Sequence, residues 1–238
     1  MANFPFQRLQ ADLAALIAST PPGQRLTSEP DLAKQLGVSR ATLREAMRTF
    51  ETQGLIRRRQ GSGTYVVGKI PVIDAGLEVL ESIDTMAQRM NLEIQVSDLH
   101  VEQVSADKET AADLDISEGA FVTRVRRVIR ADGRPAAYLI DTLPETIFKP
   151  NDMPSEFRGS VLDFLIKRGD KLGVSRAGIS ATNAAADVAK PLEIQRDDVL
   201  LKFVSQLYDS SGKVVDYSVS YFIPGYFRFH VNRRVGSS

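Results

Sequence analysis

The sequence predicts an α+β protein built from two units, and three observations support this prediction. Apolar residues recur at helical spacing as far as Phe50, and two short β-like runs follow them. Two later segments, residues 111–140 and 189–219, repeat one pattern of helix end, strand, turn and strand. The chain has 238 residues, which is long enough for two separate cores.

Formal charge is divided unevenly along the chain. Residues 1–70 contain ten Lys or Arg and five Asp or Glu, whereas residues 71–238 contain twenty and twenty-five. The N-terminal part is therefore net +5 and the remainder net −5. Such an asymmetry suggests that the basic part binds a polyanion.

Composition excludes several kinds of site. Because the chain has no cysteine, it has no disulfide, no thiolate metal site and no cysteine nucleophile. His100 and His230 are the only histidines, which argues against a histidine-rich metal centre. We therefore predict no metal and no cofactor. Neither a signal peptide nor a run of about 18 apolar residues is visible, so we expect a cytoplasmic protein without membrane contact.

Three helices are expected in the basic unit. Apolar residues from Phe6 to Ile17 lie at helical spacing, and "STPPGQ" ends this first helix. Ser28 is a suitable N-cap for a short second helix, which Gly37 ends, and Ser39 is a suitable N-cap for a third. The apolar stripe of the third helix consists of Leu43, Ala46, Met47 and Phe50. Two short helices joined by a tight glycine turn predict a helix-turn-helix.

The apolar stripe of the third helix decides which of its residues face outward. Arg40, Ala41, Thr42, Arg44 and Arg48 cannot also reach the core, so they are available to a partner. The positive end of the helix favours phosphate, and arginine forks can read guanine in the major groove. These residues are therefore candidates for DNA binding.

A β-hairpin is expected directly after the third helix. The runs "LIRRRQ" and "TYVV" flank a Gly-Ser-Gly turn at residues 61–63. Arg58 on the first strand, with Gln60 and Gly61 at the tip, could lie along or in a groove of DNA. The alternative is that these arginines form only a solvated face. We favour nucleic-acid binding, because cation excess, turn geometry and hairpin coincide in one short stretch.

Residues 5–68 resemble the winged helix-turn-helix DNA-binding domain of the GntR superfamily of bacterial transcription regulators. The resemblance rests on "PPGQRLTSEPDLAKQLGVSRATLREAMRTFETQGLIRRRQGSGTYVV". It implies that Arg40, Thr42 and Arg44 enter the major groove, that Gln60 and Gly61 reach the minor groove or its edge, and that Ser39 contacts phosphate. Pro30 departs from the family, in which many members have an arginine that helps with DNA contact.

The second unit should follow a linker. "VGKIPVIDAG", residues 67–76, contains turn formers without periodicity. We therefore expect a DNA-binding domain at 1–68, a linker at 69–76 and an effector-binding and dimerisation domain at 77–238. Because two repeat copies are too few for a solenoid, the repeat predicts one mixed α/β domain with a shared antiparallel sheet.

Arg127 is the most informative residue of this second unit. Alternation places it on the same strand face as Phe121, Val125 and Ile129. A cation on an apolar face is costly unless it meets a carboxylate, carbonyl groups or an anionic ligand. Arg127 therefore either forms an internal salt bridge, lies at a sheet edge, or anchors the anionic group of a small molecule.

The strand opposite Arg127 depends on the turn between the two strands. If that turn has four residues, the register places Tyr138 across from Arg127. Asp216 and Tyr217 occupy the matching strand of the second repeat copy. All three residues are candidates for the same ligand site.

Residues 75–235 resemble the effector-sensing UTRA domain, which is related in fold to chorismate lyase and marks the HutC subfamily of GntR regulators. The resemblance rests on "RRVIRADGRPAAY", "GSVLDFL", "KVVDYSVSYF" and "YFRFHV". In phosphosugar-sensing relatives, two arginines alternate on the strand, and acidic, serine and tyrosine side chains complete the pocket. The matching residues here are Ser82, Arg127, Ser160 and Asp216.

Three departures from that pocket change the expected ligand. The positions of a second arginine, an acid and a tyrosine are Ile129, Leu139 and Phe222. A pocket that loses these polar groups should hold a less polar ligand. We therefore expect an anionic metabolite with an apolar part, such as a small organic acid, rather than a sugar phosphate.

The function that this resemblance implies is a ligand-responsive transcription factor, most often a repressor. A homodimer would present two recognition helices to a pseudo-palindromic operator. One alternative is an enzyme on the lyase-like domain, although no catalytic triad, phosphate loop or metal cluster is visible in the sequence. The other alternative is a DNA-binding protein that responds to no effector.

Overall fold

The computed structural model describes residues 4–59, 62–67, 72–154, 157 and 159–234. Contacts divide the chain into two compact units. The first comprises residues up to Val72 with Pro224–Tyr226, and the second comprises Ile73–Ile223 with the residues from Phe227 onward. Within the described residues, no helix is both long enough and apolar enough to span a membrane.

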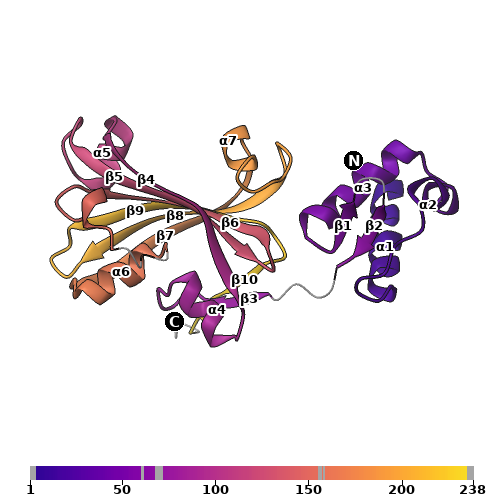
Figure 1. Ribbon diagram of the computed structural model, residues 1–238, viewed down its shortest axis with the longest axis horizontal. Coiled ribbons are helices and arrows are strands. Elements are labelled where there is room, and N and C mark those ends of the chain that lie inside the picture. The colour runs from indigo at the N-terminus through magenta and orange to yellow at the C-terminus, as the bar shows by residue number, and fades with distance from the viewer. Residues whose placement is uncertain (1–3, 60–61, 68–71, 155–156, 158, 235–238) are drawn as a thin grey trace. The chain divides into compact units, whose positions relative to one another are not determined.

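The first unit contains three helices and a β-hairpin (Figure 1). Its elements are α1 (Phe4–Ser19), α2 (Glu29–Gln35), α3 (Arg40–Thr52), β1 (Ile56–Arg59) and β2 (Gly63–Val66). The two strands are antiparallel, with Ile56 opposite Val66 and Arg59 opposite Gly63. The predicted helix-turn-helix and hairpin are confirmed.

Helix ends in this unit follow the local sequence. The Ser28 hydroxyl accepts a hydrogen bond from the Asp31 backbone N–H, and the Ser39 hydroxyl accepts one from Thr42. Both predicted N-caps are therefore confirmed, and such a cap typically stabilises a helix by about 1 kcal/mol. Gly37, between the two helices, has a φ of 67°, a left-handed conformation that glycine adopts without a steric cost.

The core of the first unit joins all of its elements. Leu13 of α1, Leu32 of α2, Leu43 and Met47 of α3, and Ile56 of β1 are fully buried in one cluster. The stripe predicted for α3 is thus its core face. Because that face is fixed by packing, the opposite face of α3 must point outward.

The second unit is built on a six-stranded antiparallel sheet. In sheet order, its strands are β4 (Ile94–Ser105), β5 (Phe121–Ala131), β6 (Arg134–Pro144), β9 (Val214–Phe222), β8 (Val199–Asp209) and β7 (Leu172–Asn183). The two repeat copies form the hairpins β5–β6 and β8–β9, which meet where β6 pairs with β9. The repeat therefore forms one shared sheet, as predicted.

Short helices flank both faces of the sheet. They are α4 (Ile83–Arg89), α5 (Lys108–Leu114), the 3₁₀ helix η1 (Pro150–Asp152), α6 (Val161–Arg168) and α7 (Ala186–Ala189). Figure 1 shows α4 and α6 on one side of the sheet and α5 and α7 on the other. We name the α4/α6 side the inner face, since Val125 of β5 packs there against Val161 and Leu165 of α6.

One part of the stretch predicted as linker is regular structure. Residues 73–76 form β3 (Ile73–Gly76), which pairs in parallel with β10 (Phe227–His230). The reason is that Ile73 and Ala75 are both buried and pack against Met86 and Ala87 of α4. Residues 68–71 lie outside the described residues.

Candidate nucleic-acid interface and effector site

The N-terminal half of α3 presents the predicted outward face. Ser39 and the first residues of the helix are exposed, whereas Leu43, Ala46 and Met47 are fully buried on the other side. The exposed residues are Ser39, Arg40, Ala41, Thr42 and Arg44. The alanine between arginine and threonine leaves the backbone open to close approach. Two cations and two hydroxyls therefore lie together at a helix N-terminus, a combination that suits a nucleic-acid backbone and base edges.

The start of α3 is held in one conformation by two hydroxyls. The Ser39 Oγ and Thr42 Oγ1 atoms are 2.8 Å apart, and Ser39 Oγ also accepts the Thr42 N–H at 3.1 Å. A hydroxyl has one donor and two acceptor positions, so the Thr42 hydroxyl keeps capacity for further hydrogen bonds. Thr42 is therefore a restrained side chain rather than a free rotor.

Two other arginines of α3 differ in accessibility. The Arg44 side chain is 60% exposed, so its guanidinium can reach a partner. The Arg48 side chain is half-buried and lies 4.0 Å from a Glu45 carboxylate oxygen. Arg48 is the less accessible candidate of the two.

Arg58 of β1 does not extend freely from the hairpin. Its side chain is only 24% exposed, and its Nε atom lies 3.4 Å from Glu29 Oε1 and 3.5 Å from Glu51 Oε2. Its Nη2 atom donates a hydrogen bond to the Arg44 carbonyl oxygen at 3.2 Å. We predicted Arg58 as a DNA contact, whereas the structure places its guanidinium against groups of its own unit.

The described part of the hairpin contains a close approach that the sequence did not reveal. Gly63 has a φ of 117°, and a Cβ atom there would lie 2.4 Å from Arg25 Nε. Arg25 also forms an isolated antiparallel bridge with Tyr65. Gln60 and Gly61, both predicted to reach DNA, lie outside the described residues.

Arg127 lies on the inner face of the sheet, where it forms an ion pair with Asp141 of β6. Arg127 is only 6% exposed and Asp141 is also buried. Of the alternatives that the sequence left open, the structure shows the internal carboxylate. Sequence reasoning missed Asp141, although it lies two residues along β6 from Leu139, the residue paired with Arg127.

Asp216 of β9 is the third member of this buried charge cluster. Burial raises its pKa well above the ordinary range for aspartate, the neighbouring Asp141 raises it further, and Arg127 opposes both effects. A side-chain hydrogen bond joins the two carboxyl groups. In the described part of the chain, Asp216 Oδ1 is buried without a hydrogen-bond partner. The arrangement favours a protonated Asp216 beside the ion pair of Arg127 and Asp141.

Ser82 and Ser160, which we predicted as effector-binding residues, are N-caps of two helices that begin close together. Ser82 caps α4 by accepting the Thr85 N–H, and Ser160 caps α6 by accepting the Asp163 N–H. Ser82 Oγ also donates to Asp163 Oδ2 at 2.7 Å, which joins the two helix starts.

Electrostatics and packing tie these helix starts to Arg127. Burial raises the pKa of Asp84, the second residue of α4, and the charge of Asp163 raises it further, while Arg127 lowers it. Gly159, directly before Ser160, has a φ of 96°, and a Cβ atom there would lie 3.0 Å from Arg127 Cδ. The structure therefore brings Ser82, Arg127, Ser160 and Asp216 together.

The predicted register of Tyr138 is wrong by one residue. Tyr138 pairs with Val128, and Leu139 pairs with Arg127. A bulge between Ile129 and Arg130 adds one residue to β6, and a one-residue shift moves every later side chain to the opposite face.

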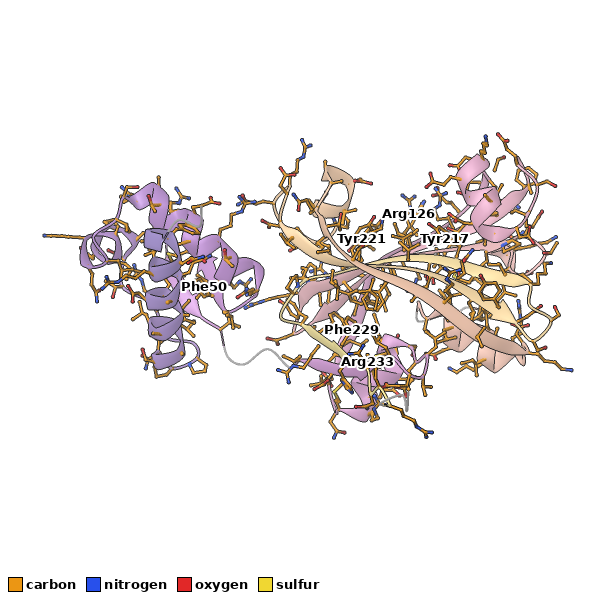
Figure 2. The ribbon with its side chains drawn as sticks, turned by 180° about the vertical axis from the view of Figure 1, so that it is seen from behind. Phe50, Arg126, Tyr217, Tyr221, Phe229 and Arg233 are labelled. Atoms are coloured by element: carbon orange, nitrogen blue, oxygen red, sulfur yellow. The ribbon has the colours of Figure 1, made fainter. Side chains whose placement is uncertain are left out.

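Tyr138 therefore lies on the side of the sheet opposite the inner face, which we call the outer face, away from Arg127. Tyr217 lies on the same side, because it pairs with Thr142, four residues along β6 from Tyr138. Tyr138 stacks on Tyr221 with ring centroids 6.5 Å apart. Figure 2 labels Tyr217 and Tyr221 beside Arg126 on this side of the sheet. Burial raises the pKa of Tyr217 to about 12, and Asp113 contributes to the increase. These tyrosines form an aromatic surface that does not adjoin Arg127.

Each of the two histidines lies beside carboxylates of its own surroundings, and the charge of His230 also acts on Glu78. His100 Nε2 is 3.4 Å from Glu102, and His230 Nδ1 is 2.9 Å from Asp74. No group of three or more His, Asp or Glu side chains that could hold a metal occurs among the residues with described positions.

Comparisons with known proteins agree on both units. Residues 5–66 match the family model described as bacterial regulatory proteins, gntR family, and residues 89–228 match the UTRA domain. The mannosyl-D-glycerate transport/metabolism system repressor MngR of Escherichia coli is 27% identical over 210 residues, which cover 87% of this chain and 86% of MngR. The repressor NagR of Bacillus subtilis is 28% identical over 204 residues, covering 84% and 81%.

Solved structures show the same fold. The crystal structure of PhnF from Mycobacterium smegmatis aligns with a TM-score of 0.65 at 21% identity, covering 96% of this chain and all of that one. The effector domain of the same PhnF, solved separately, aligns with 68% of this chain at a TM-score of 0.62. The two-unit fold is therefore shared with full-length PhnF.

Proposed function

Since this chain belongs to the gntR family of bacterial regulatory proteins and carries a UTRA domain, it is a DNA-binding transcription regulator, and we propose that it is an effector-released repressor. The relatives MngR and NagR are both named as repressors. The observation that carries this proposal is the exposed start of α3, where Arg40, Thr42 and Arg44 point away from the core. The protein would act in the cytoplasm, where its operator lies.

Operator binding would require two copies of the chain. A homodimer places two recognition helices about one helical turn, roughly 34 Å, apart along a pseudo-palindromic operator. Because the affinity of the pair depends on simultaneous engagement, a modest change in the spacing of the two helices removes much of it. An effector that favours the wrong spacing then releases the repressor.

The effector would bind at the inner face of the sheet, beside Arg127. Its anionic group would compete with Asp141 for the Arg127 guanidinium, and the displaced carboxylate would share a proton with Asp216. Its apolar part would lie against Ile129 and Leu139, which follow on the same face. The hydrogen bond from Ser82 to Asp163 joins the starts of α4 and α6, so a rearrangement at Arg127 would also move α4 and the strand β3 that packs against it.

Selection of bound fragments from a random DNA pool tests this function. The full-length protein is mixed with the pool, with and without an extract of cell metabolites. The proposal expects one pseudo-palindromic sequence to be enriched and the extract to reduce its retention. If no sequence is enriched, the protein does not bind DNA specifically and the proposal is contradicted. If a sequence is enriched but the extract does not change its retention, the result supports a DNA-binding regulator that responds to no effector.

Binding of candidate small molecules tests the effector class. Calorimetric titration of the full-length protein compares organic acids with sugar phosphates. The proposal expects an organic acid to bind and Arg127→Ala to abolish its binding. Tight binding of a sugar phosphate that Arg127→Ala leaves unchanged would contradict both the ligand class and the site.

A further inference from the structure

Glu29 lies between two arginines of the DNA-binding unit. It is the first residue of α2, and its carboxylate oxygens lie 3.6 Å from Arg44 Nε and 3.4 Å from Arg58 Nε. Its side chain is only 22% exposed, whereas Arg44 is 60% exposed. One carboxylate therefore connects α2 to the recognition helix and to the hairpin.

Arg58 completes the connection from the hairpin side. Its Nη2 atom donates to the carbonyl oxygen of Arg44, and its Nε atom lies near both Glu29 and Glu51. Its backbone N–H also donates to Glu51 Oε1 at 3.3 Å. Arg58 thus contacts both the backbone and the carboxylate neighbour of Arg44. We call Glu29, Arg44, Glu51 and Arg58 the arginine clamp.

The clamp leaves one edge of Arg44 available. A guanidinium has donors at Nε and at two Nη atoms in a rigid plane. Glu29 approaches the Nε atom of Arg44, so the pair of Nη groups remains for a partner. Two parallel donors are the group that reads O6 and N7 of guanine.

The position of Glu29 is unfavourable for non-specific DNA binding. A carboxylate beside a surface that meets phosphates opposes the attraction on which non-specific affinity depends. Helix N-termini do favour an acidic first turn, and Asp31 is a second acidic residue in the same turn of α2. The contact of Glu29 with both arginines is what separates it from an ordinary first-turn acid.

We propose that Glu29, supported by Arg58, is a specificity-determining positioning residue that holds Arg44 for base reading and weakens non-specific binding. This inference rests on the proposed operator binding. Of the four residues of the clamp, only Arg44 would contact DNA directly. Removing the Glu29 charge should therefore change affinity for specific and for unrelated DNA in opposite directions.

The experiment compares the full-length parent with Glu29→Gln on two duplexes. One is the sequence that the parent enriches from the random pool, and the other is a scrambled duplex of equal length and composition. Glu29→Gln should weaken binding to the selected duplex about fivefold, because Arg44 loses its orientation. It should strengthen binding to the scrambled duplex about twofold, because one negative charge is gone.

Glu45→Gln is the matched control for charge. Glu45 is an exposed acid of α3 that lies near Arg48, and its ion pair does not involve Arg44 or Arg58. Its replacement should strengthen binding to both duplexes alike. If Glu29→Gln does the same, Glu29 acts only through charge and the proposal is overturned.

A double variant tests whether Glu29 acts through Arg44. The ratio to measure is the affinity for the selected duplex divided by the affinity for the scrambled duplex. In an Arg44→Ala background, Glu29→Gln should no longer lower this ratio. A further fall in this ratio in the double variant would overturn the proposal that Glu29 acts through Arg44. Equal weakening on both duplexes by Glu29→Gln alone would show a merely structural role and would also overturn the proposal. A parent that enriches no duplex would overturn the proposed function, and this inference with it, whereas an unchanged ratio in Glu29→Gln overturns the inference alone.

Discussion

Arg127 illustrates how one buried charge constrains its neighbours. A guanidinium that leaves water loses its hydration, and only a well-placed counter-charge offsets that loss. Asp141 supplies the charge, and burial keeps the pKa of the adjacent Asp216 raised, so that the cluster avoids a second full negative charge. The cluster is nearly neutral, which is the only arrangement that such a buried group of three can adopt at low cost.

Removal of Arg127 should therefore be strongly destabilising. Arg127→Ala leaves Asp141 buried without its counter-charge, and we expect the free energy of unfolding to fall by about 3–5 kcal/mol, measured by denaturant titration. Arg126→Ala is the control, because Arg126 is the adjacent residue on the outer face and its pair with Glu102 is partly exposed. That change should cost about 1 kcal/mol or less. Equal losses would contradict the stabilising role of the buried pair.

Asp216 predicts a dependence of stability on pH. Because its pKa is raised in the folded state, the folded protein holds a proton that the unfolded chain releases above about pH 4. Its contribution to stability is therefore present at low pH and is lost as pH rises towards the raised pKa. Asp216→Asn should remove this loss, so the stability of the variant relative to the parent should increase with pH. Thermal unfolding across about pH 4 to 8 measures the difference, and a difference independent of pH would contradict the prediction.

At the scale of an element, the hairpin of the first unit depends on residues outside it for its position. Its orientation against α3 rests on Arg58, and the start of β2 rests on the absence of a side chain at Gly63, where Arg25 packs. The strands themselves are short, and a two-stranded hairpin is marginally stable alone. Contacts outside the hairpin therefore position it.

Gly63→Ala should disturb this packing more than a comparable glycine change elsewhere. Both Gly63 and Gly23 have positive φ, so an alanine is strained by about 1 kcal/mol at either site. A Cβ atom would meet Arg25 only at Gly63, since nothing lies within 4 Å at Gly23. Thermal unfolding should show the larger loss for Gly63→Ala, and Arg25→Ala in that background should reduce the difference. Equal losses for the two glycine variants would show that Arg25 moves aside freely.

The salt dependence of DNA binding separates the two roles available to an arginine. If Arg58 only positions its neighbours, Arg58→Ala should weaken binding without changing the slope of log affinity against log salt. If Arg40 contacts phosphate, Arg40→Ala should reduce that slope by about one. Fluorescence anisotropy at several salt concentrations measures both variants. A reduced slope for Arg58→Ala would show that it meets phosphate directly.

At the scale of the whole molecule, regulation would depend on two copies acting together. The four central strands of the sheet come from the two repeat copies, and β4 and β7 of the same chain form its edges, so one chain supplies all six strands. A second chain would therefore contribute spacing between recognition helices rather than completing the fold. Under the proposed function, the spacing of the two recognition helices along DNA is then the property that an effector would change.

The spacing of half-sites in the selected operator tests this view. Insertion of about five base pairs, roughly half a helical turn, places the second half-site on the opposite side of the duplex. Affinity should fall at least about tenfold, because only one recognition helix can then engage. Insertion of about ten base pairs should restore part of it. Affinity that does not depend on the insertion, measured by mobility shift, would indicate that single chains bind independently.

The sequence by itself determined the features that depend on near neighbours. The N-caps Ser28 and Ser39, the core stripe of α3 and the hairpin were predictable, because capping, helical periodicity and turns act over a few residues. The shared sheet was predictable for a related reason, since each repeat copy is a local hairpin. The exposure of the first turns of α3 followed from the same periodicity.

Only the tertiary structure decided which distant residues meet. A single bulge in β6 moved Tyr138 away from Arg127, and no local signal marks one extra residue within an alternating strand. The partners Asp141 for Arg127 and Glu29 for Arg58 lie on other elements, as does the strand that pairs with residues 73–76. Such contacts depend on how helices and strands pack, so they follow from the complete fold and not from the spacing of residues along the chain.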